Sequence, residues 1–312
     1  MPRVLFGDYQ LCEGIGANPA ATQYLARRAP PGGGALLALR IHPHLTAAPY
    51  SDMFAVEART SSRVVHPHVA RVHEVRKHEG ALWVVREYVH GETLADIVGR
   101  GRERGAGPSL SFARSIVAGV ADGLHAAHEL SSEGGAALHL VHRNVRPGTL
   151  LVTYDGIPKV TDFGVAHCIP SAELPGGHIE KLAYMSPEQV RGEPIDRRTD
   201  VFALGVVLWE LAAARPLFPT DGDLETLERV QACRVPSLGS VGAECPSSLE
   251  DVIMTALSAS PEARYPTARA FAEAIRATSS AGHDRRDDDY VLSLFAERAR
   301  AHQELVRRWA DA

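Results

Sequence analysis

Residues 139–164, HLVHRNVRPGTLLVTYDGIPKVTDFG, decide the fold when they are read with the sequence on either side. Two short motifs mark this stretch, HRNVRP at 142–147 and DFG at 162–164. Each motif alone is a weak signal, since short patterns also arise by chance. Their order along the chain, together with further motifs before and after them, carries the specificity.

The sequence before residue 88 is rich in expected strands. Residues 36–41 (LLALRI) and 81–87 (ALWVVRE) are short apolar runs typical of buried strands. Residues 51–64 between them have helical periodicity. After Gly91 long helices are expected, at 111–130, 200–214, 249–257 and 267–278. The pattern predicts an α+β protein with a small β-rich lobe followed by a larger α-helical lobe.

The domain organisation follows from these patterns. Residues 1–8 are expected to be a lead, and 9–278 a two-lobed domain divided into 9–88 and 89–278. Residues 279–289 (SSAGHDRRDDD) are polar and charged, as a linker would be. Residues 290–312 resume a helical pattern, with apolar side chains among charges. Packing against the domain is favoured over partner binding as the role of this last helix.

Composition excludes several classes of function. The 312 residues include 33 Lys and Arg against 38 Asp and Glu, a net charge of -5. This balance gives no reason to expect nucleic acid or an anionic membrane as partner. The sequence predicts no membrane span and no secretory leader. Its four scattered cysteines are expected to be reduced thiols in a cytoplasmic protein, and the His-Pro-His motifs at 42–44 and 66–68 are interpreted as turns.

Further motifs follow one another over residues 9–278. In order they are GIG at 14–16, LALR at 37–40, Glu57, EYV at 87–89, HRNVRP, DFG, SPE at 186–188, Asp200 and Arg264. This ordered series resembles the protein kinase superfamily, in its bacterial eukaryotic-like Ser/Thr branch, and the insertion before HRNVRP is similar to kinases of myxobacteria. The resemblance implies a nucleotide cleft between two lobes.

Three positions of the implied catalytic loop depart from the family pattern. Asn144 stands where the resemblance implies an aspartate that accepts the substrate proton. A neutral amide cannot act as a base, and loss of such a group costs on the order of 10²–10⁴ in rate. Thr149 replaces an asparagine that holds the second Mg²⁺, and its shorter side chain makes ligation doubtful. Arg146 replaces a residue that is lysine in most kinases.

The implied phosphate and metal contacts depart as well. Arg40 replaces the lysine that bridges the nucleotide phosphates and Glu57. Because guanidinium prefers bidentate pairing with a carboxylate, a fixed ion pair between Arg40 and Glu57 is favoured over nucleotide contact. Asp162 is retained as a candidate metal ligand, so one metal is the most that this set supports.

The implied adenine site carries further changes. Gly14 and Gly16 are kept, but Pro19 stands near the third glycine position and offers no N–H to a phosphate. Ala38, Glu87, Val89 and Leu151 remain candidate nucleotide contacts. Arg86 aligns with a position that is usually apolar at the back of the pocket. A guanidinium buried there needs a partner, and pairing with Glu57 or Asp162 would fill the adenine pocket.

The scaffold positions match the family pattern. Asp200 is expected to accept hydrogen bonds from the catalytic-loop backbone, Glu188 to pair with Arg264, and Phe163 to pack on His142. The implied activation segment, 162–188, has no threonine, and its hydroxyl side chains are Ser171, Tyr184 and Ser186. Positions implied to be catalytic have changed while structural positions have not.

These departures favour a pseudokinase that acts in signalling by binding a protein, with an active kinase or another signalling protein as the candidate partner. No cofactor is required on this interpretation. One alternative is a weak Ser/Thr kinase that uses ATP with one Mg²⁺ or Mn²⁺ on Asp162. The other is a switch that binds nucleotide without turnover.

Overall fold

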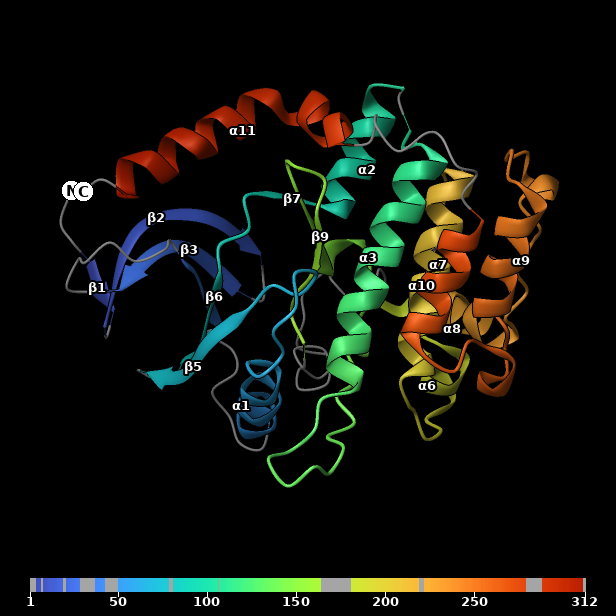
Figure 1. The fold of residues 1–312 in the computed structure, drawn as a ribbon, viewed down its shortest axis with the longest axis horizontal. Helices are drawn as coiled ribbons and strands as arrows, with labels where there is room; N and C mark the ends of the chain where they lie inside the picture. The colour runs from blue at the N-terminus through green and yellow to red at the C-terminus, as the bar shows by residue number, and fades with distance from the viewer. Residues whose placement is uncertain are drawn as a thin grey trace.

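The protein has two lobes, a β-sheet lobe at one end and a helical lobe at the other (Figure 1). The computed structural model describes residues 4–6, 8–18, 21–28, 37–42, 50–78, 81–105, 107–163, 181–218, 222–278 and 288–310. The chain passes from the first lobe to the second directly after strand β6, and both ends of the chain lie beside the sheet.

The first lobe is an antiparallel six-stranded sheet with one helix, and its spatial order is β1-β2-β3-β4-β6-β5. One face buries a cluster around Leu39 and Trp83, and the other packs Ala55 and Ala58 of the helix against Leu82. Alternate burial of this kind follows from the two-residue period of a strand. The elements are β1 (Val4–Phe6), β2 (Tyr9–Asn18), β3 (Ala21–Arg28), β4 (Leu37–His42), α1 (Tyr50–Ser61), β5 (Val72–His78) and β6 (Ala81–Glu87).

The second lobe is built around two long helices, α3 (Leu110–His128) and α7 (Arg198–Ala213). Its remaining helices are α2 (Leu94–Glu103), α6 (Pro187–Arg191), α8 (Asp223–Ala232), α9 (Ser247–Ala256), α10 (Ala268–Ala277) and α11 (Asp288–Ala310). A small sheet of β7 (Gly91–Thr93), β8 (Leu150–Thr153) and β9 (Pro158–Val160) lies between the lobes.

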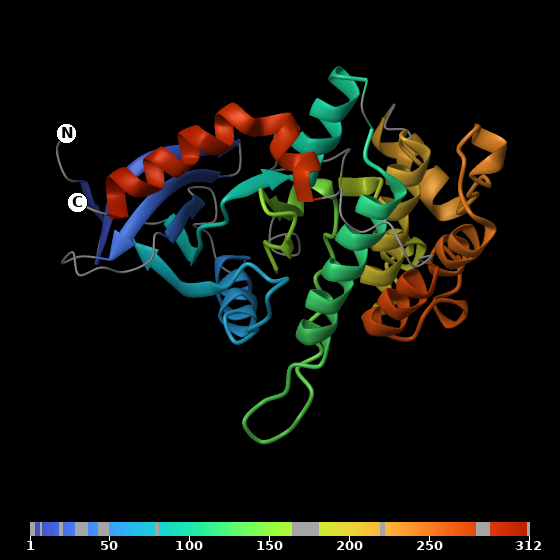
Figure 2. The ribbon, with the colours of Figure 1, turned by 45° about the horizontal axis from the view of Figure 1, so that its top comes forward.

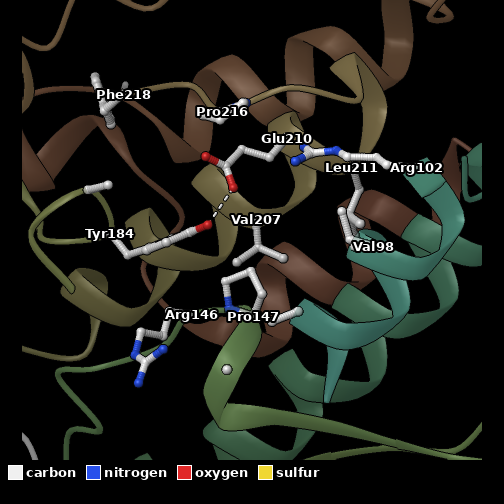
Figure 3. A pocket seen from close by; sticks show the side chains of 14 residues that line it. Val98, Arg102, Arg146, Pro147, Tyr184, Val207, Glu210, Leu211, Pro216 and Phe218 are labelled. Carbon is white, nitrogen blue, oxygen red and sulfur yellow. Dashed lines mark hydrogen bonds between the residues drawn. The ribbon is translucent and has the colours of Figure 1, made fainter. Parts of the chain in front are cut away.

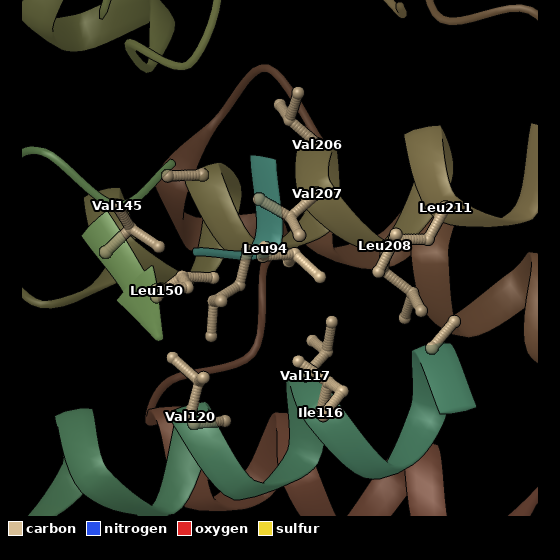
Figure 4. Close-up of a cluster of buried hydrophobic side chains, with 14 of the residues drawn as sticks. Leu94, Ile116, Val117, Val120, Val145, Leu150, Val206, Val207, Leu208 and Leu211 are labelled. Carbon is tan, nitrogen blue, oxygen red and sulfur yellow. The ribbon is translucent and has the colours of Figure 1, made fainter. Parts of the chain in front are cut away.

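The main core lies where α3 faces α7. Figure 4 shows Ile116, Val117 and Val120 of α3 pointing toward Val207 of α7, with Leu94 between them. Side chains on α7 are buried on nearly all sides, so this helix is the centre of the lobe. Val145, inside the loop 142–149, and Leu150, directly after it, belong to the same cluster, and the core therefore fixes the position of that loop.

Polar caps set where three of the helices begin. The hydroxyl of Ser109 accepts a hydrogen bond from the N–H of Phe112 at the start of α3. Thr93 does the same for α2, and Thr267 for α10. A side-chain oxygen at this position satisfies one of the backbone donors that a helix start leaves unpaired.

The two-lobed α+β fold expected from the sequence is confirmed, with helix ends that differ by one to three residues. The lead expected at 1–8 contributes β1, which pairs with β2. Helices α2, α6 and α8 were not anticipated. Residues 279–287 of the expected linker lie outside the described residues, and α11 begins two residues before the expected tail helix.

Two features near α3 bear on the sequence interpretations. The hairpin-like insertion after α3 projects from the helical lobe (Figure 2) and is closed by a bridge between Ser131 and Ala137.

His68 packs on α3, where Gly123 leaves room for its backbone, and its Nδ1 lies 2.9 Å from the Pro158 oxygen. The motif at 66–68 is thus a packed turn, whereas residues 43–49 of the other His-Pro-His region lie outside the described residues. Among the described helices none is long and apolar enough to span a lipid bilayer.

A buried ion pair supports the helical lobe, as expected. Arg264 donates from Nη1 and Nη2 to the two carboxylate oxygens of Glu188, at 2.7 and 2.8 Å. Burial raises the pKa of Glu188, but the hydrogen bonds and charge of Arg264 outweigh it and leave that pKa lowered. Thr199 adds a further hydrogen bond at 2.9 Å.

We expect Glu188→Gln to lower the free energy of unfolding by about 3–5 kcal/mol, because Arg264 is left buried without its counter-charge. Urea denaturation followed by circular dichroism measures the loss. Glu193→Gln is the matched control, since Glu193 pairs with Arg191 at the surface, and its midpoint should not move. Equal shifts in the two variants would contradict a structural role for the buried pair.

Candidate functional site

The cleft between the lobes holds a cavity of about 750 Å³. This volume is within the range of small-molecule sites, about 300–1,000 Å³. Six of the nine candidate nucleotide contacts line it, namely Ala38, Arg40, Glu87, Val89, Leu151 and Asp162. The other expected contacts, Gly14, Gly16 and Glu57, are not among its described lining residues, and Pro19 lies outside the described part of the chain.

Asp162 is bound by two arginines at the inner end of this cavity. Arg40, in the middle of β4, forms a close ion pair with its Oδ2. Arg86, at the end of β6, donates from Nη1 to its Oδ1 at 3.1 Å. The carboxylate expected to hold a metal is therefore engaged on both of its oxygens by protein cations.

Arg86 fills the back of the cavity. Its side chain is 7% exposed, and it hydrogen-bonds the hydroxyl of Thr161 and, at 3.2 Å, Oε1 of Gln23. Burial lowers the pKa of Arg86, and Asp162 opposes this effect. Of the two partners that the sequence suggested for this guanidinium, the structure selects Asp162.

The ion pair expected between Arg40 and Glu57 is wrong. Glu57 of α1 instead accepts a hydrogen bond from Nη1 of Arg143 at 3.3 Å. Burial raises the pKa of Glu57, and the charge of Arg143 lowers it by less. The reason for the different pairing is that Arg40 has a nearer carboxylate in Asp162, which leaves Glu57 to the arginine of the catalytic loop.

The catalytic loop is held from below by Asp200, as expected. Asp200 is fully buried and accepts hydrogen bonds at 2.8 Å from the backbone N–H groups of His142 and Arg143. Burial raises its pKa, but the hydrogen bond from His128 and the nearby donors leave that pKa lowered. His142 packs edge-on against Phe163, with ring centroids 4.6 Å apart, which confirms that expectation.

The altered side chains of the catalytic loop do not assemble a metal site. The hydroxyl of Thr149 is 2.9 Å from the Asn144 carbonyl oxygen and 3.0 Å from that of Arg146, and the residue is 1% exposed. That hydroxyl holds the loop instead of pointing into the cavity. Oδ1 of Asn144 is buried and has no hydrogen-bond partner in the described part of the chain. Within the same ranges no three His, Cys, Asp or Glu side chains are grouped to hold a metal ion.

Most of the expected activation segment, residues 164–180, lies outside the described residues. This range includes Gly164 and Ser171. Beyond it, Ser186 is fully buried. Tyr184 donates from its hydroxyl to Oε2 of Glu210 at 2.6 Å.

A second, smaller pocket of about 280 Å³ lies beside the catalytic loop and was not anticipated from the sequence. Figure 3 shows Tyr184 and Glu210 joined across it, with Arg102 of α2 and Pro147 of the loop on its walls. Glu210 also accepts a hydrogen bond from the backbone N–H of Leu217 at 3.0 Å. Burial raises the pKa of Glu210 more than these bonds lower it.

Sequence reasoning also missed two residues at the mouth of the main cavity. Arg298 and His302 of α11 line it on the side of the hinge, the segment 87–93 that joins the lobes. They lie more than 200 residues along the chain from the hinge they contact, and no local motif marks them. Their positions depend on how the last helix packs.

A family profile described as "Protein kinase domain" matches residues 35–275, well over half of the chain. The chain belongs to the protein kinase family. Among curated proteins it is 35% identical over 277 residues to "Tyrosine-protein kinase MasK" of Myxococcus xanthus, covering 86% of this chain and 43% of that protein. It is 28% identical to "Serine/threonine-protein kinase PrkC" of Bacillus subtilis, over 84% of this chain and 39% of that one.

Solved structures show the same fold. The kinase domain of PknI from Mycobacterium tuberculosis matches with a TM-score of 0.70 and 24% identity, over 89% of this chain and 99% of that chain. The kinase chain described here spans less than half the length of the two curated relatives. The bacterial eukaryotic-like Ser/Thr kinase family inferred from the motifs is thereby confirmed.

We expect Asp162→Asn to lower the free energy of unfolding by about 3–5 kcal/mol, because Arg86 and Arg40 would then face each other without a carboxylate. Chemical denaturation measures this loss. The control is Asp155→Asn on an exposed turn, which should change stability little.

A second substitution tests the cause of that loss. Arg86→Met in the Asp162→Asn chain removes the unpaired buried cation and should recover most of the stability. If the two changes are additive, or if Asp162→Asn is neutral, Asp162 is not the counter-ion that holds Arg86 in the cleft.

Proposed function

We propose that this kinase chain is a pseudokinase, with little or no phosphoryl transfer, that works in cytoplasmic signalling by binding another protein. The observation that carries the proposal is the engagement of Asp162 by both Arg40 and Arg86. Phosphoryl transfer depends on metal ions that neutralise the transferred phosphate. A divalent cation at Asp162 would have to displace two guanidiniums and then remain close to their charge.

Asn144 supports the same proposal, because its position is the one that would accept the proton of the protein substrate. An amide offers no base for the proton of an attacking hydroxyl. Base loss alone leaves a slow enzyme, because positioning supplies most of the catalysis. In this chain two further changes act together with Asn144: two arginines occupy the metal ligand Asp162, and the guanidinium of Arg86 lies in the adenine pocket. The proposed cleft therefore offers neither a proton acceptor nor a free metal ligand.

The partner is proposed to be a signalling protein, with an active kinase as one candidate. Support comes from the retained scaffold, since the Asp200 and Glu188 contacts of the family fold are intact although the nucleotide contacts have changed. A kinase fold that is retained after its catalytic residues have changed can still serve as a surface that binds another protein.

A metal-free nucleotide switch is the second candidate. The cavity stays open at about 750 Å³, and Arg40 and Arg86 together exceed the charge of Asp162. An anionic phosphate could use this excess positive charge without Mg²⁺. The third candidate, a weak Ser/Thr kinase with one metal, draws support from relatives that are named as kinases.

Thermal unfolding with millimolar ATP, together with an assay of phosphoryl transfer, distinguishes the pseudokinase, the nucleotide switch and the weak kinase. We expect no shift of the wild-type melting temperature with EDTA, Mg²⁺ or Mn²⁺, and no transfer of radiolabel to a protein substrate. A ligand at about 100 times its Kd adds roughly 2.7 kcal/mol, so binding would be visible as a shift of several degrees. A shift in EDTA without transfer identifies the switch. Label transfer that Asp162→Ala abolishes identifies an enzyme and refutes the pseudokinase.

The converse experiment restores the family residues at the cavity. Arg40→Lys with Arg86→Met removes both guanidiniums from Asp162 and places an apolar side chain at the back of the cavity, so this variant should gain a Mg²⁺-dependent shift with ATP. Arg71→Met is the control, because Arg71 is an exposed arginine directly before β5. A double variant that folds but shows no shift would mean that the two arginines are not what excludes the metal-bound nucleotide.

A further inference from the structure

Helix α11 lies across both lobes, although it is outside the residues that the family profile matches. Figures 1 and 2 both show it running from the neighbourhood of α2, past the hinge, to the strands β2 and β3. Its helical geometry is interrupted at Phe295, where φ is -128° and ψ is 26°. The interruption divides it into a first part, residues 288–295, and a second part, residues 296–310.

The first part is anchored in the helical lobe by apolar contacts. Val291 and Leu294 belong to the main core and are 0% and 4% exposed. The ring of Tyr290 packs against Phe112 of α3, with centroids 5.1 Å apart. Arg104, at the end of α2, donates to the Ser293 carbonyl oxygen at 2.9 Å, next to the interruption.

The second part buries Ala299 and Leu305, and it contacts the hinge through polar groups. Arg298 donates to Oε2 of Glu92 at 2.8 Å, and the Tyr154 hydroxyl donates to the other oxygen at 2.5 Å. The ring of His302 lies 6.2–6.4 Å from those of Tyr88, His90 and Tyr154. Glu92 is 6% exposed, so its pairing with Arg298 closes one side of the cavity mouth.

The far end of the second part reaches the sheet by weaker contacts. Arg27 of β3 donates to the Trp309 carbonyl oxygen at 3.4 Å. Arg308 lies 3.9 Å from Glu13 of β2, and its side chain is 68% exposed. An ion pair this exposed adds little to stability, so this end depends mainly on the hinge contact and on the buried side chain of Leu305.

Docking also leaves polar atoms unpaired. The Tyr88 hydroxyl, Nε2 of His90 and Nδ1 of His302 are buried without a hydrogen-bond partner in the described part of the chain. Buried polar atoms lose the hydrogen bonds they would make with water. Release of the second part would return water to all three, which offsets some of the stabilisation that the docked helix provides.

We propose that α11 is a releasable strap: its second part closes the hinge side of the cleft and ties the sheet lobe to the hinge, and it can leave while the first part stays anchored. The apolar anchor, the interruption at Phe295 and the polar, partly unpaired hinge contact divide the helix into these two units. The strap would act on lobe opening whether or not the cleft binds nucleotide. A test of the strap is therefore independent of the proposed function.

Hydrogen exchange of the full chain, read by mass spectrometry, tests the strap. Arg298→Glu places a second carboxylate against buried Glu92 and should release the second part. We expect exchange about tenfold faster or more at residues 297–309 and 87–93, with residues 288–294, α3 and α7 unchanged. Arg300→Glu is the matched control on the same helix, at an exposed position, and should leave all of these rates at wild-type values.

Two outcomes would overturn the strap. Hinge exchange at the wild-type rate in Arg298→Glu would show that this contact does not hold the hinge. Equal acceleration of residues 288–294 and of α3 would show that α11 is part of one cooperative unit and cannot release separately.

The pH dependence of hydrogen exchange provides a second, independent test of the strap. His302 faces Tyr88, His90 and Glu92 of the hinge, Tyr154 of the β8–β9 turn, and Arg298 of its own helix. Burial lowers the pKa of His302, and Glu92 opposes this effect. The docked state therefore favours the neutral ring, so docking should be complete above about pH 6.5 and weaken as the pH falls below it.

We expect the hinge of the wild type to exchange faster, relative to α3, at about pH 5.5 than at about pH 7.5 after correction for intrinsic rates. His302→Gln should remove most of this difference. A pH response that persists unchanged in His302→Gln assigns the effect to another group and excludes His302 as the group that controls release.

Discussion

The shared carboxylate of Asp162 is the interaction on which the rest of the cleft depends. A guanidinium at position 86 is buried at the back of the cavity, where it cannot remain charged without a counter-ion. Asp162 supplies that charge, and its second oxygen then takes Arg40. With Arg40 committed there, Glu57 pairs with Arg143 of the catalytic loop. One substitution in β6 thus rearranges the charge pairs of the whole site.

This rearrangement changes what the inner end of the cleft attracts. Two guanidiniums and one carboxylate leave an excess of one positive charge, where an aspartate alone would draw a divalent cation. The field favours anions and opposes metal ions, and the effect is strong because the groups are largely screened from water. On the proposed function, weakened metal binding would follow from this charge arrangement, and Asn144 would add a separate, chemical deficit.

The sequence predicted more of the fold than of the site, for physical reasons. Strand and helix periods reflect burial along one element, so LLALRI and the helix around Asp200 could be placed without coordinates. The need of Arg86 for a carboxylate was also predictable, because burial makes that need strong. The choice of Arg40 between Glu57 and Asp162 was not predictable, since both are carboxylates and the outcome depends on distances between elements.

The missed elements have a related explanation. Helix α2 carries two glycines and many charges, so its local pattern is weak, and its position depends on the cap at Thr93 and on packing of Leu94. The contact between Arg298 and Glu92 joins segments 206 residues apart. A charged helix surface gives no sign of which acidic residue it will meet. Such contacts arise from the packed fold and cannot be read from spacing.

The charge pairs of the cleft also tie the two lobes together. Arg40 and Arg86 belong to the sheet lobe, whereas Asp162 follows β9 between the lobes, and Glu57 reaches from α1 to the catalytic loop. Turnover in enzymes with such clefts requires opening and closing. Ties inside the cleft work against that motion. A cleft held this way would present one defined surface to the protein partner that we propose.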